Sequence, residues 1–121
     1  MKSPRNDGKY SWTNHSVQKM KFYGLSESRI KRIVRFPKRL EEGIAFETVA
    51  VMQPAGTKRY QEIWVMYKIT NSKLKNQNVK FWNPFSTDKK IKIITAWRYP
   101  GKSPERDPVP ADIIREIQTL L

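Results

Sequence analysis

Apolar and polar positions follow two different periods along this chain. From about residue 14 to residue 36 the apolar side chains recur at helical spacing, and between residues 44 and 99 they alternate as in β-strands. Four prolines punctuate residues 100–110, and helical spacing returns from residue 111. The pattern predicts an α+β domain in which two N-terminal helices pack on a twisted antiparallel sheet of three to four strands, with a further helix at the C-terminus.

The first helix is predicted over residues 15–23. Thr13 or Asn14 can cap its N-terminus, and Gly24 is suited to the position just after its C-terminus. At 100° per residue, one side of this helix is apolar and the other side is mixed. The apolar side carries Val17 and Met20, and the mixed side carries His15, Lys19 and Phe22.

The second helix is predicted from Glu27 to about Arg35, after the capping residue Ser26 and before the Phe36-Pro37 pair. Its apolar side chains share one face, which we expect to be buried. The remaining surface carries four basic side chains, Arg29, Lys31, Arg32 and Arg35. A solvated face needs only two or three such charges, so this helix is a candidate nucleic-acid contact.

Three strands are predicted over residues 44–53, 60–69 and 91–99, and a short one over residues 79–82. A turn over residues 55–57 makes the first two an antiparallel hairpin. The strand over residues 91–99 has apolar residues on both faces, so we expect it to be central, with a partner on each side. The polar stretch from residue 71 to residue 78 is predicted to be a loop.

The ends of the chain differ in composition from its middle. Residues 1–11 are predicted to form a flexible polar arm, and residues 12–99 to form the α+β domain. Residues 100–121 are predicted to be a proline-rich segment followed by an amphipathic helix. The apolar positions of that helix are Ile113, Ile114, Ile117, Leu120 and Leu121.

The charge of the chain points to a polyanion partner. Its 121 residues include 24 Lys and Arg against 11 Asp and Glu, a formal net charge of +13. Residues 57–102 hold 11 basic and two acidic side chains, whereas the last 19 residues hold two basic and four acidic ones. Because neutralising phosphates releases condensed counterions, such clustering favours a nucleic acid or a ribonucleoprotein, such as RNA or the ribosome, as partner. The alternative is a basic protein with no polyanion partner.

Several classes of protein are excluded or not expected. The absence of cysteine excludes disulfides and thiol catalysis. No apolar run approaches the roughly 20 residues of a membrane span and the N-terminus lacks an apolar signal core, so we expect a cytoplasmic protein with no membrane partner. One histidine, carboxylates without ligand spacing and scattered glycines predict neither a metal nor a cofactor. The oligomeric state is left open.

Metal-free chemistry on a phosphodiester is the one catalytic option that the residues leave open. It needs a proton acceptor, a proton donor and cations around the developing negative charge. His15 is the candidate acid–base group because imidazole titrates near neutrality, and Lys19 lies one helical turn further on. Arg98, between two aromatic residues at the end of a strand, is the candidate for charge stabilisation. The alternatives are a structural histidine and an arginine in a cross-strand contact.

Two tryptophans and a lysine complete the candidate nucleic-acid contacts. Trp64 and Lys68 share one face of the strand over residues 60–69, where they could stack a base and hold a phosphate. Trp97, next to Arg98, is a second candidate for stacking. The alternative for Trp64 is packing beneath a helix, the commoner place for tryptophan.

Three motifs carry a resemblance to a known family. The N-terminal run His15-Ser16-Val17-Gln18-Lys19-Met20 is followed by Gly24-Leu25-Ser26 and by a helix that ends at Pro37. A later strand ends with Ile94-Thr95-Ala96-Trp97-Arg98-Tyr99. In their order and spacing, over about residues 12–99, these motifs resemble an uncharacterised branch of the RelE/BrnT-like family of toxin-related proteins.

The resemblance implies two N-terminal helices on a twisted antiparallel sheet, and a metal-independent endoribonuclease or ribosome-dependent mRNA cutter paired with an antitoxin protein. By position, His15 and Lys19 match the family's N-terminal motif, and Arg98 matches an arginine used near the scissile phosphate. The chain departs from the pattern in having Lys19 where arginine is commoner, in the length of residues 71–90, and in the added residues 100–121. The alternatives are a non-catalytic nucleic-acid-binding module and a protein-docking domain that uses the C-terminal helix.

Overall fold

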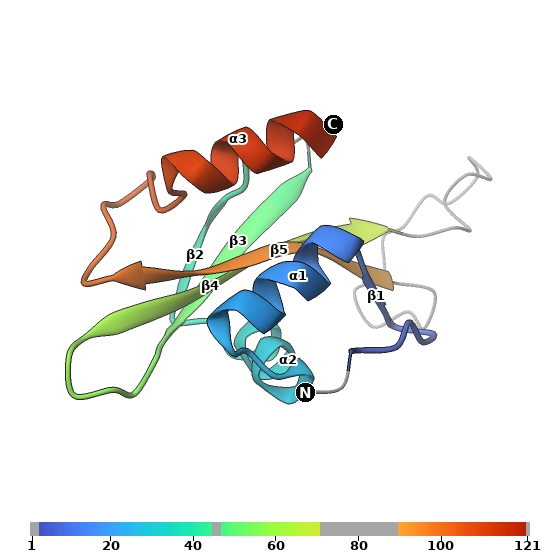
Figure 1. The fold of residues 1–121 in the computed structure, drawn as a ribbon, viewed down its shortest axis with the longest axis horizontal. Coiled ribbons are helices and arrows are strands. Elements are labelled where there is room, and N and C mark those ends of the chain that lie inside the picture. The colour runs from blue at the N-terminus through green and yellow to red at the C-terminus, as the bar shows by residue number, and fades with distance from the viewer. Residues whose placement is uncertain (1–2, 45–46, 71–89, 121) are drawn as a thin grey trace, which may run out of the picture.

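The computed structural model describes residues 3–44, 47–70 and 90–120, and it confirms the predicted α+β class (Figure 1). Three helices accompany one five-stranded sheet in the described part of the chain. The elements follow in the order β1 (Tyr10–Trp12), α1 (Asn14–Tyr23), α2 (Glu27–Arg35), β2 (Arg39–Glu42), β3 (Thr48–Pro54), β4 (Gln61–Thr70), β5 (Lys90–Pro100) and α3 (Ala111–Leu120).

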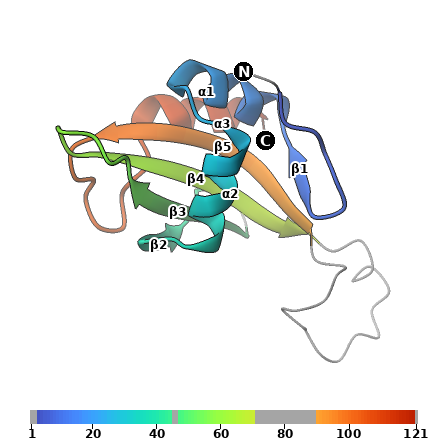
Figure 2. The same ribbon diagram turned by 90° about the horizontal axis from the view of Figure 1, so that it is seen from below.

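The sheet has the strand order β1-β5-β4-β3-β2 (Figure 2). β1 runs parallel to β5, with Tyr10 opposite Ile91, and every other neighbouring pair is antiparallel. β5 has β1 on one side and β4 on the other, so the prediction of a central strand there is confirmed. The β4–β5 pair is the longest, and it places Trp64 opposite Trp97.

Several predicted details of the sheet were wrong. The sheet is mixed and has five strands, not three to four antiparallel ones. Tyr10 and Ser11, placed in the flexible arm, belong to β1, and the strand predicted from residue 44 begins at Thr48. β2 was missed because its sequence, Arg-Leu-Glu-Glu, has little β-propensity and no alternation of its own. The short strand predicted at residues 79–82 and the loop at 71–78 lie outside the described residues.

The two N-terminal helices begin and end as their sequences predict. The Thr13 side chain accepts a hydrogen bond from the Ser16 N–H, and the Ser26 side chain accepts one from the Arg29 N–H. Gly24 ends α1 in the left-handed conformation, with φ of 67°, which a glycine adopts without a Cβ clash. Local chemistry therefore fixes the bounds of α1 and α2.

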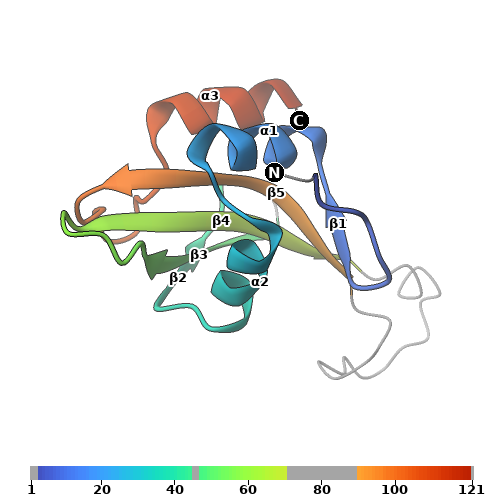
Figure 3. The ribbon, with the colours of Figure 1, turned by 60° about the horizontal axis from the view of Figure 1, so that its bottom comes forward.

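Two apolar cores lie on opposite faces of the sheet. One joins α1 and α2 to the sheet through residues that include Met20, Ile33 and Val65. The other joins α3 to the sheet and includes Trp64, Trp97 and Ile117. Figure 3 shows α2 on one side of the sheet and α3 on the other, with α1 alongside β5. Because side chains alternate along a strand, each strand residue is assigned to one of these two sides.

Candidate functional site

The two catalytic candidates of α1 lie together, and they meet a carboxylate of α3. The Lys19 Nζ donates to Glu116 Oε1 at 2.8 Å, and His15 Nε2 lies 3.5 Å from Glu116 Oε2. The side chains of His15 and Lys19 are only 11% and 14% exposed, whereas that of Glu116 is 38% exposed. We call these three residues the α1–α3 contact. The sequence showed no partner for His15 because Glu116 is about a hundred residues away along the chain.

Burial is the main influence on the imidazole of the α1–α3 contact. It lowers the pKa of His15 below its usual value of 6.5, the Glu116 carboxylate opposes this, and the Lys19 ammonium adds to it. The ring is therefore neutral at pH 7. Its Nε2 atom is buried and has no hydrogen-bond partner within the described part of the chain. The ring is only 11% exposed and lies against the Glu116 side chain of α3, so its unused nitrogen is poorly accessible to a substrate.

Aromatic rings of α1 surround the Lys19 ammonium. The Nζ atom lies 5.5 Å from the ring centre of Phe22 and 5.8 Å from that of Tyr23. Burial raises the pKa of the Tyr23 hydroxyl, so this group also stays neutral at pH 7. Lys19 thus has a full set of local partners, a carboxylate and two rings.

Arg98 lies on the α1–α2 side of the sheet and holds the C-terminal end of α1. It is opposite Ile63 in the β4–β5 pair, and its Nε donates to the Tyr23 carbonyl at 3.0 Å. Its Nη1 lies 3.5 Å from Gln61 Oε1. Since helix C-terminal carbonyls lack partners within the helix, Arg98 satisfies one of them. These contacts favour the structural alternative for Arg98.

Lys68 lies far from Arg98. It is opposite Thr48 in the β3–β4 pair, on the α3 side, and its Nζ is 3.8 Å from Glu47 Oε2. Five residues of β4 separate it from Ile63, the partner of Arg98, a distance of about 17 Å at 3.3–3.4 Å per residue. Lys68 and Arg98 therefore project from opposite faces and distant points of the sheet, and with His15 they do not line one groove.

The two candidate stacking tryptophans are fully buried. Trp64 and Trp97 stack on each other with ring centres 6.0 Å apart and an interplanar angle of 5°. Each indole N–H has a partner, Glu62 Oε1 for Trp64 and the Pro108 carbonyl for Trp97. α3 lies over both rings. In this arrangement neither ring is accessible to a base, which agrees with the alternative of packing beneath a helix.

The four basic candidates of α2 divide into two pairs. Arg29 donates to the Ala55 carbonyl at 2.9 Å. Lys31 lies 3.8 Å from Asp7 and 3.7 Å from Glu27, and over the ring of Tyr10. Arg32 and Arg35 are exposed, and their guanidinium groups have no hydrogen-bond or ion-pair partner among the residues that the structure describes. We call Arg32 and Arg35 the α2 surface.

The backbone beneath the α2 surface is held firmly. Gln53 of β3 donates its amide N–H groups to the carbonyls of Arg32 and Phe36, at 3.3 and 2.7 Å. These contacts fix the end of α2 on the sheet while the two guanidinium groups extend into solvent. The α2 surface is thus a fixed pair of cations without local neutralisation.

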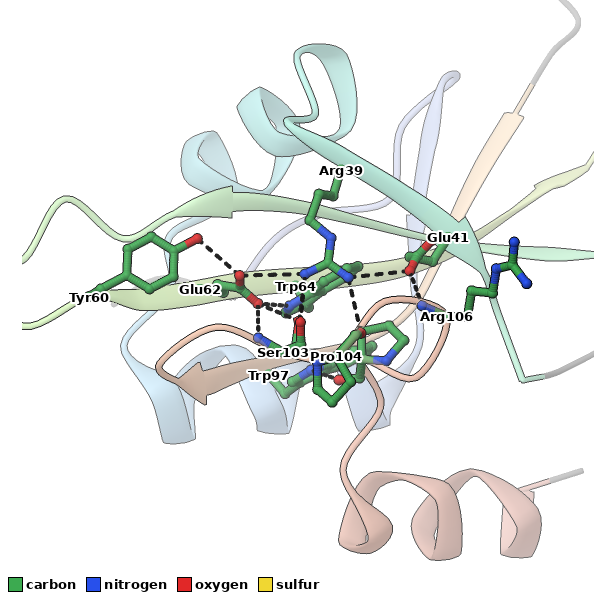
Figure 4. A network of polar contacts seen from close by, with 10 residues as sticks. Arg39, Glu41, Tyr60, Glu62, Trp64, Trp97, Ser103, Pro104 and Arg106 are labelled. Carbon is green, nitrogen blue, oxygen red and sulfur yellow. Dashed lines mark hydrogen bonds and ion pairs between the residues drawn. The ribbon is translucent and has the colours of Figure 1, made fainter.

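A buried carboxylate that the sequence did not single out lies at the centre of a network of polar contacts (Figure 4). Glu62 is fully buried on the α3 side of β4. Its oxygens accept hydrogen bonds from the Tyr60 hydroxyl, the Trp64 indole and the backbone N–H and hydroxyl of Ser103. Burial by itself would raise the pKa of Glu62, but these hydrogen bonds outweigh it and lower the pKa below 4.5.

Arg39 of β2 completes this cluster. Its Nη1 is 3.6 Å from Glu62 Oε2 and donates to the carbonyl and hydroxyl of Ser103. Its Nη2 donates to Glu41 and to the Pro104 carbonyl, and its guanidinium lies 5.0 Å from the Trp64 ring centre. We call Glu62 with its partners the Glu62 network. It fastens the segment before α3 to the sheet, and because Ser103 is only 1% exposed it offers no accessible nucleophile.

Neither a metal cluster nor a membrane helix is found in residues 3–44, 47–70 and 90–120. No three His, Cys, Asp or Glu side chains there gather closely enough to hold a metal ion. No helix there is long and apolar enough to cross a membrane.

Comparison with known proteins adds no relative. No family model, no curated protein and no solved structure matches this chain. The resemblance to the RelE/BrnT-like family, and the site roles and partners that it implies, therefore stay predictions.

Proposed function

We propose that this protein binds RNA, as a non-catalytic module, through the α2 surface. The observation that carries the proposal is the state of Arg32 and Arg35, which are exposed and lack an acidic partner among the described residues. The other two cations of α2 are engaged within the chain. Cations that fold stability does not use are available to phosphates.

The charge of the whole chain supports the same proposal. A formal net charge of +13 creates a field that attracts a polyanion and speeds its encounter. Guanidinium groups bind phosphate oxygens in a bidentate way, and each neutralised phosphate releases counterions. The binding would follow the sugar–phosphate backbone and not the base sequence, because contacts to phosphates carry no sequence information.

A metal-independent endoribonuclease of RelE-like type, with an antitoxin partner, is the second candidate. Two observations favour it: His15 and Lys19 lie side by side, and His15 Nε2 has no hydrogen-bond partner among the described residues. Against it, α3 covers this pair, and Arg98 and Lys68 lie elsewhere. We therefore rank binding above cleavage.

The first experiment compares two matched double variants in RNA binding. R32Q/R35Q removes the α2 surface, and R5Q/R115Q removes two other exposed arginines with the same change of charge. For a single-stranded RNA, we expect R32Q/R35Q to weaken binding about tenfold at 0.1 M salt and to reduce the slope of log K against log salt by about 1.4. The control should change both quantities much less. Equal losses in the two variants would contradict a localised α2 surface.

The second experiment separates binding from cleavage. RNA, alone and on translating ribosomes, is incubated with the protein in the presence of a metal chelator. We expect bound but uncut RNA over pH 5–9. Cleavage that is lost in His15→Ala would instead establish the second candidate.

A further inference from the structure

One edge of the sheet is open to solvent. β2 is the last strand in the order, and it pairs with β3 alone. The Gly43 N–H donates to the Thr48 carbonyl and the Lys38 N–H to the Met52 carbonyl, so within β2 itself the hydrogen bonds to β3 fall on Arg39 and Glu41. In an antiparallel ladder the bonding direction alternates, so the N–H and C=O groups of Leu40 and Glu42 point to the open edge. Unpaired groups of this kind are a template for a further strand.

Large apolar side chains lie in β2 and on both sides of it in the sequence: Leu40 is in the strand, Phe36 is the C-cap of α2, and Ile44 follows the strand. Phe36 is 70% exposed, Leu40 63% and Ile44 42%. They are three of the five large apolar side chains found exposed in the described residues, and they recur every fourth residue. Natural edge strands usually avoid such side chains, so their presence here points to a covered edge.

The charges of this segment are complementary to themselves when the segment is reversed. The sequence Lys38-Arg39-Leu40-Glu41-Glu42 has two cations before Leu40 and two carboxylates after it. If two copies pair antiparallel with a two-fold axis at Leu40, Lys38 lies opposite Glu42 of the second copy, and Glu42 lies opposite its Lys38. A shift of one residue removes all of these matches and also brings inward-pointing backbone groups together.

We propose that two copies of this chain form a dimer through their β2 edges, giving one continuous ten-stranded sheet. Leu40 of each copy exchanges N–H to C=O hydrogen bonds with Leu40 of the other, because both groups point outward. The side chains of Lys38 and Glu42 are exposed and have no hydrogen-bond or ion-pair partner in the described chain, so both are free to pair across the axis. A self-complementary patch of this kind is what a closed two-fold interface requires.

The described part of the chain meets β2 through residues 102–106, which bond to Arg39 and Glu41 and not to the backbone of Leu40. Arg39 and Glu41 keep their partners within the Glu62 network on the α3 side. An open pocket of about 340 Å³ lies between β2 and residues 102–106. Residues lining that pocket are Arg39, Leu40, Glu41, Lys102, Glu105 and Arg106. On the other side, Leu40 shares the face of the sheet that carries α2. The dimer would therefore present the α2 surfaces of both copies on one side, although it does not depend on RNA binding.

A charge swap tests the dimer. The mass of the RNA-free protein is measured by sedimentation over about 1–300 μM, where a small edge interface is expected to associate reversibly. Lys38→Glu alone and Glu42→Lys alone each place two like-charged pairs across the axis, and we expect each to raise the dissociation constant at least tenfold. The double variant K38E/E42K restores opposite charges and should return it to within about threefold of the original.

Two further variants complete the design. Lys92→Glu changes an exposed lysine away from this edge and should leave the dissociation constant unchanged. Leu40→Glu places two glutamates opposite each other on the axis and should abolish the dimer. A protein that is monomeric over the whole range overturns the proposal. So does a dimer that both single charge variants leave intact, because it would use another face.

Discussion

The Glu62 network and the α1–α3 contact both place charged side chains next to the α3-side core, but they differ in how fully those groups are bonded. In the Glu62 network a fully buried carboxylate accepts hydrogen bonds from three side chains and one backbone N–H, with Arg39 nearby. In the α1–α3 contact, His15 Nε2 makes no hydrogen bond within the described chain, and Glu116 is partly exposed.

This difference indicates that the Glu62 network has a structural role, whereas His15 in the α1–α3 contact can still take up a proton. A buried charge is tolerated when all of its hydrogen-bonding capacity is used. Removing one partner then lowers the free energy of unfolding by more than the intact network contributes to it, because the remaining groups are left buried and unpaired. Because Glu116 is partly exposed, the α1–α3 contact contributes little to stability. His15 Nε2 makes no hydrogen bond in the described chain and can take up a proton. The Glu62 network thus holds the segment before α3 on the sheet. His15, the one histidine of the chain, makes stability depend on pH near neutrality.

The largest effect is expected for Glu62→Ala. It leaves the donors of Tyr60, Trp64 and Ser103 without their acceptor and removes the ion pair of Glu62 with Arg39, so we expect the free energy of unfolding to fall by about 3–5 kcal/mol. Glu105 is an exposed carboxylate in the segment before α3, and Glu105→Ala should change the free energy of unfolding by less than about 0.5 kcal/mol. Urea denaturation measures both. A loss below about 1 kcal/mol in E62A would show that the network does not fasten the fold.

Opposite signs are expected for two isosteric threonine variants. Thr95 is fully buried and its hydroxyl has no partner among the described residues, so Thr95→Val should stabilise the protein by up to about 1 kcal/mol. The Thr13 hydroxyl caps α1 and donates to the Ile94 carbonyl, so Thr13→Val should destabilise it by about 1–2 kcal/mol. Thermal unfolding compares the two. Destabilisation by both would mean that Thr95 has a partner in the folded protein.

A smaller effect is expected within the α1–α3 contact. In a double-mutant cycle with Lys19→Met and Glu116→Gln, we expect a coupling energy of about 0.5–1 kcal/mol, because Glu116 is partly solvated. A coupling above about 2 kcal/mol would place this contact in the same class as the Glu62 network.

The pH dependence of His15 is the finest test of the comparison. Because its pKa in the folded protein lies below 6.5, the unfolded chain binds more protons, and stability rises with pH through this window and is lost as the pH falls below about 6.5. Nuclear magnetic resonance can follow the one imidazole directly. Glu116→Gln removes the interaction that raises the pKa, so the pKa should fall further, while Glu105→Gln serves as control. A His15 pKa at or above 6.5 would contradict burial as the dominant influence.

Acid should then affect the Glu62 network in a separate, lower window. Its folded pKa is below 4.5, so its contribution to stability is complete above that pH and is lost as the pH falls through the folded pKa.

Much of the fold could be predicted from short-range patterns. The bounds of α1 and α2 could be predicted from the caps Thr13 and Ser26 and from Gly24. Alternation of apolar and polar residues predicted β4 and β5, and the apolar residues on both faces of β5 predicted its central place. The edges could not be predicted in this way. β1 is only three residues long, and β2 is a charged segment that becomes a strand because β3 offers it a partner.

The candidate site divides along the same line. The four cations of α2 were visible in the sequence, but which of them are free was decided by Ala55, Asp7 and Glu27. Trp64 and Trp97 were visible as aromatic residues on strands, but their burial depends on where α3 packs. Tyr60 and Trp64 lie two residues on either side of Glu62, but its burial and its contacts with Arg39 and Ser103 depend on how β2 and the segment that precedes α3 pack on β4.

The sequence by itself determined the helices, the main strands, the cationic character of α2 and the charge symmetry around Leu40, because each arises from residues a few positions apart. The tertiary structure alone decided that α3 covers His15 and Lys19, that Arg98 and Lys68 lie on opposite faces, and that Glu62 is the buried anchor. Those outcomes depend on strand order and on the packing of α3 against the sheet, where the partners are brought together from distant parts of the chain and no local pattern records the match.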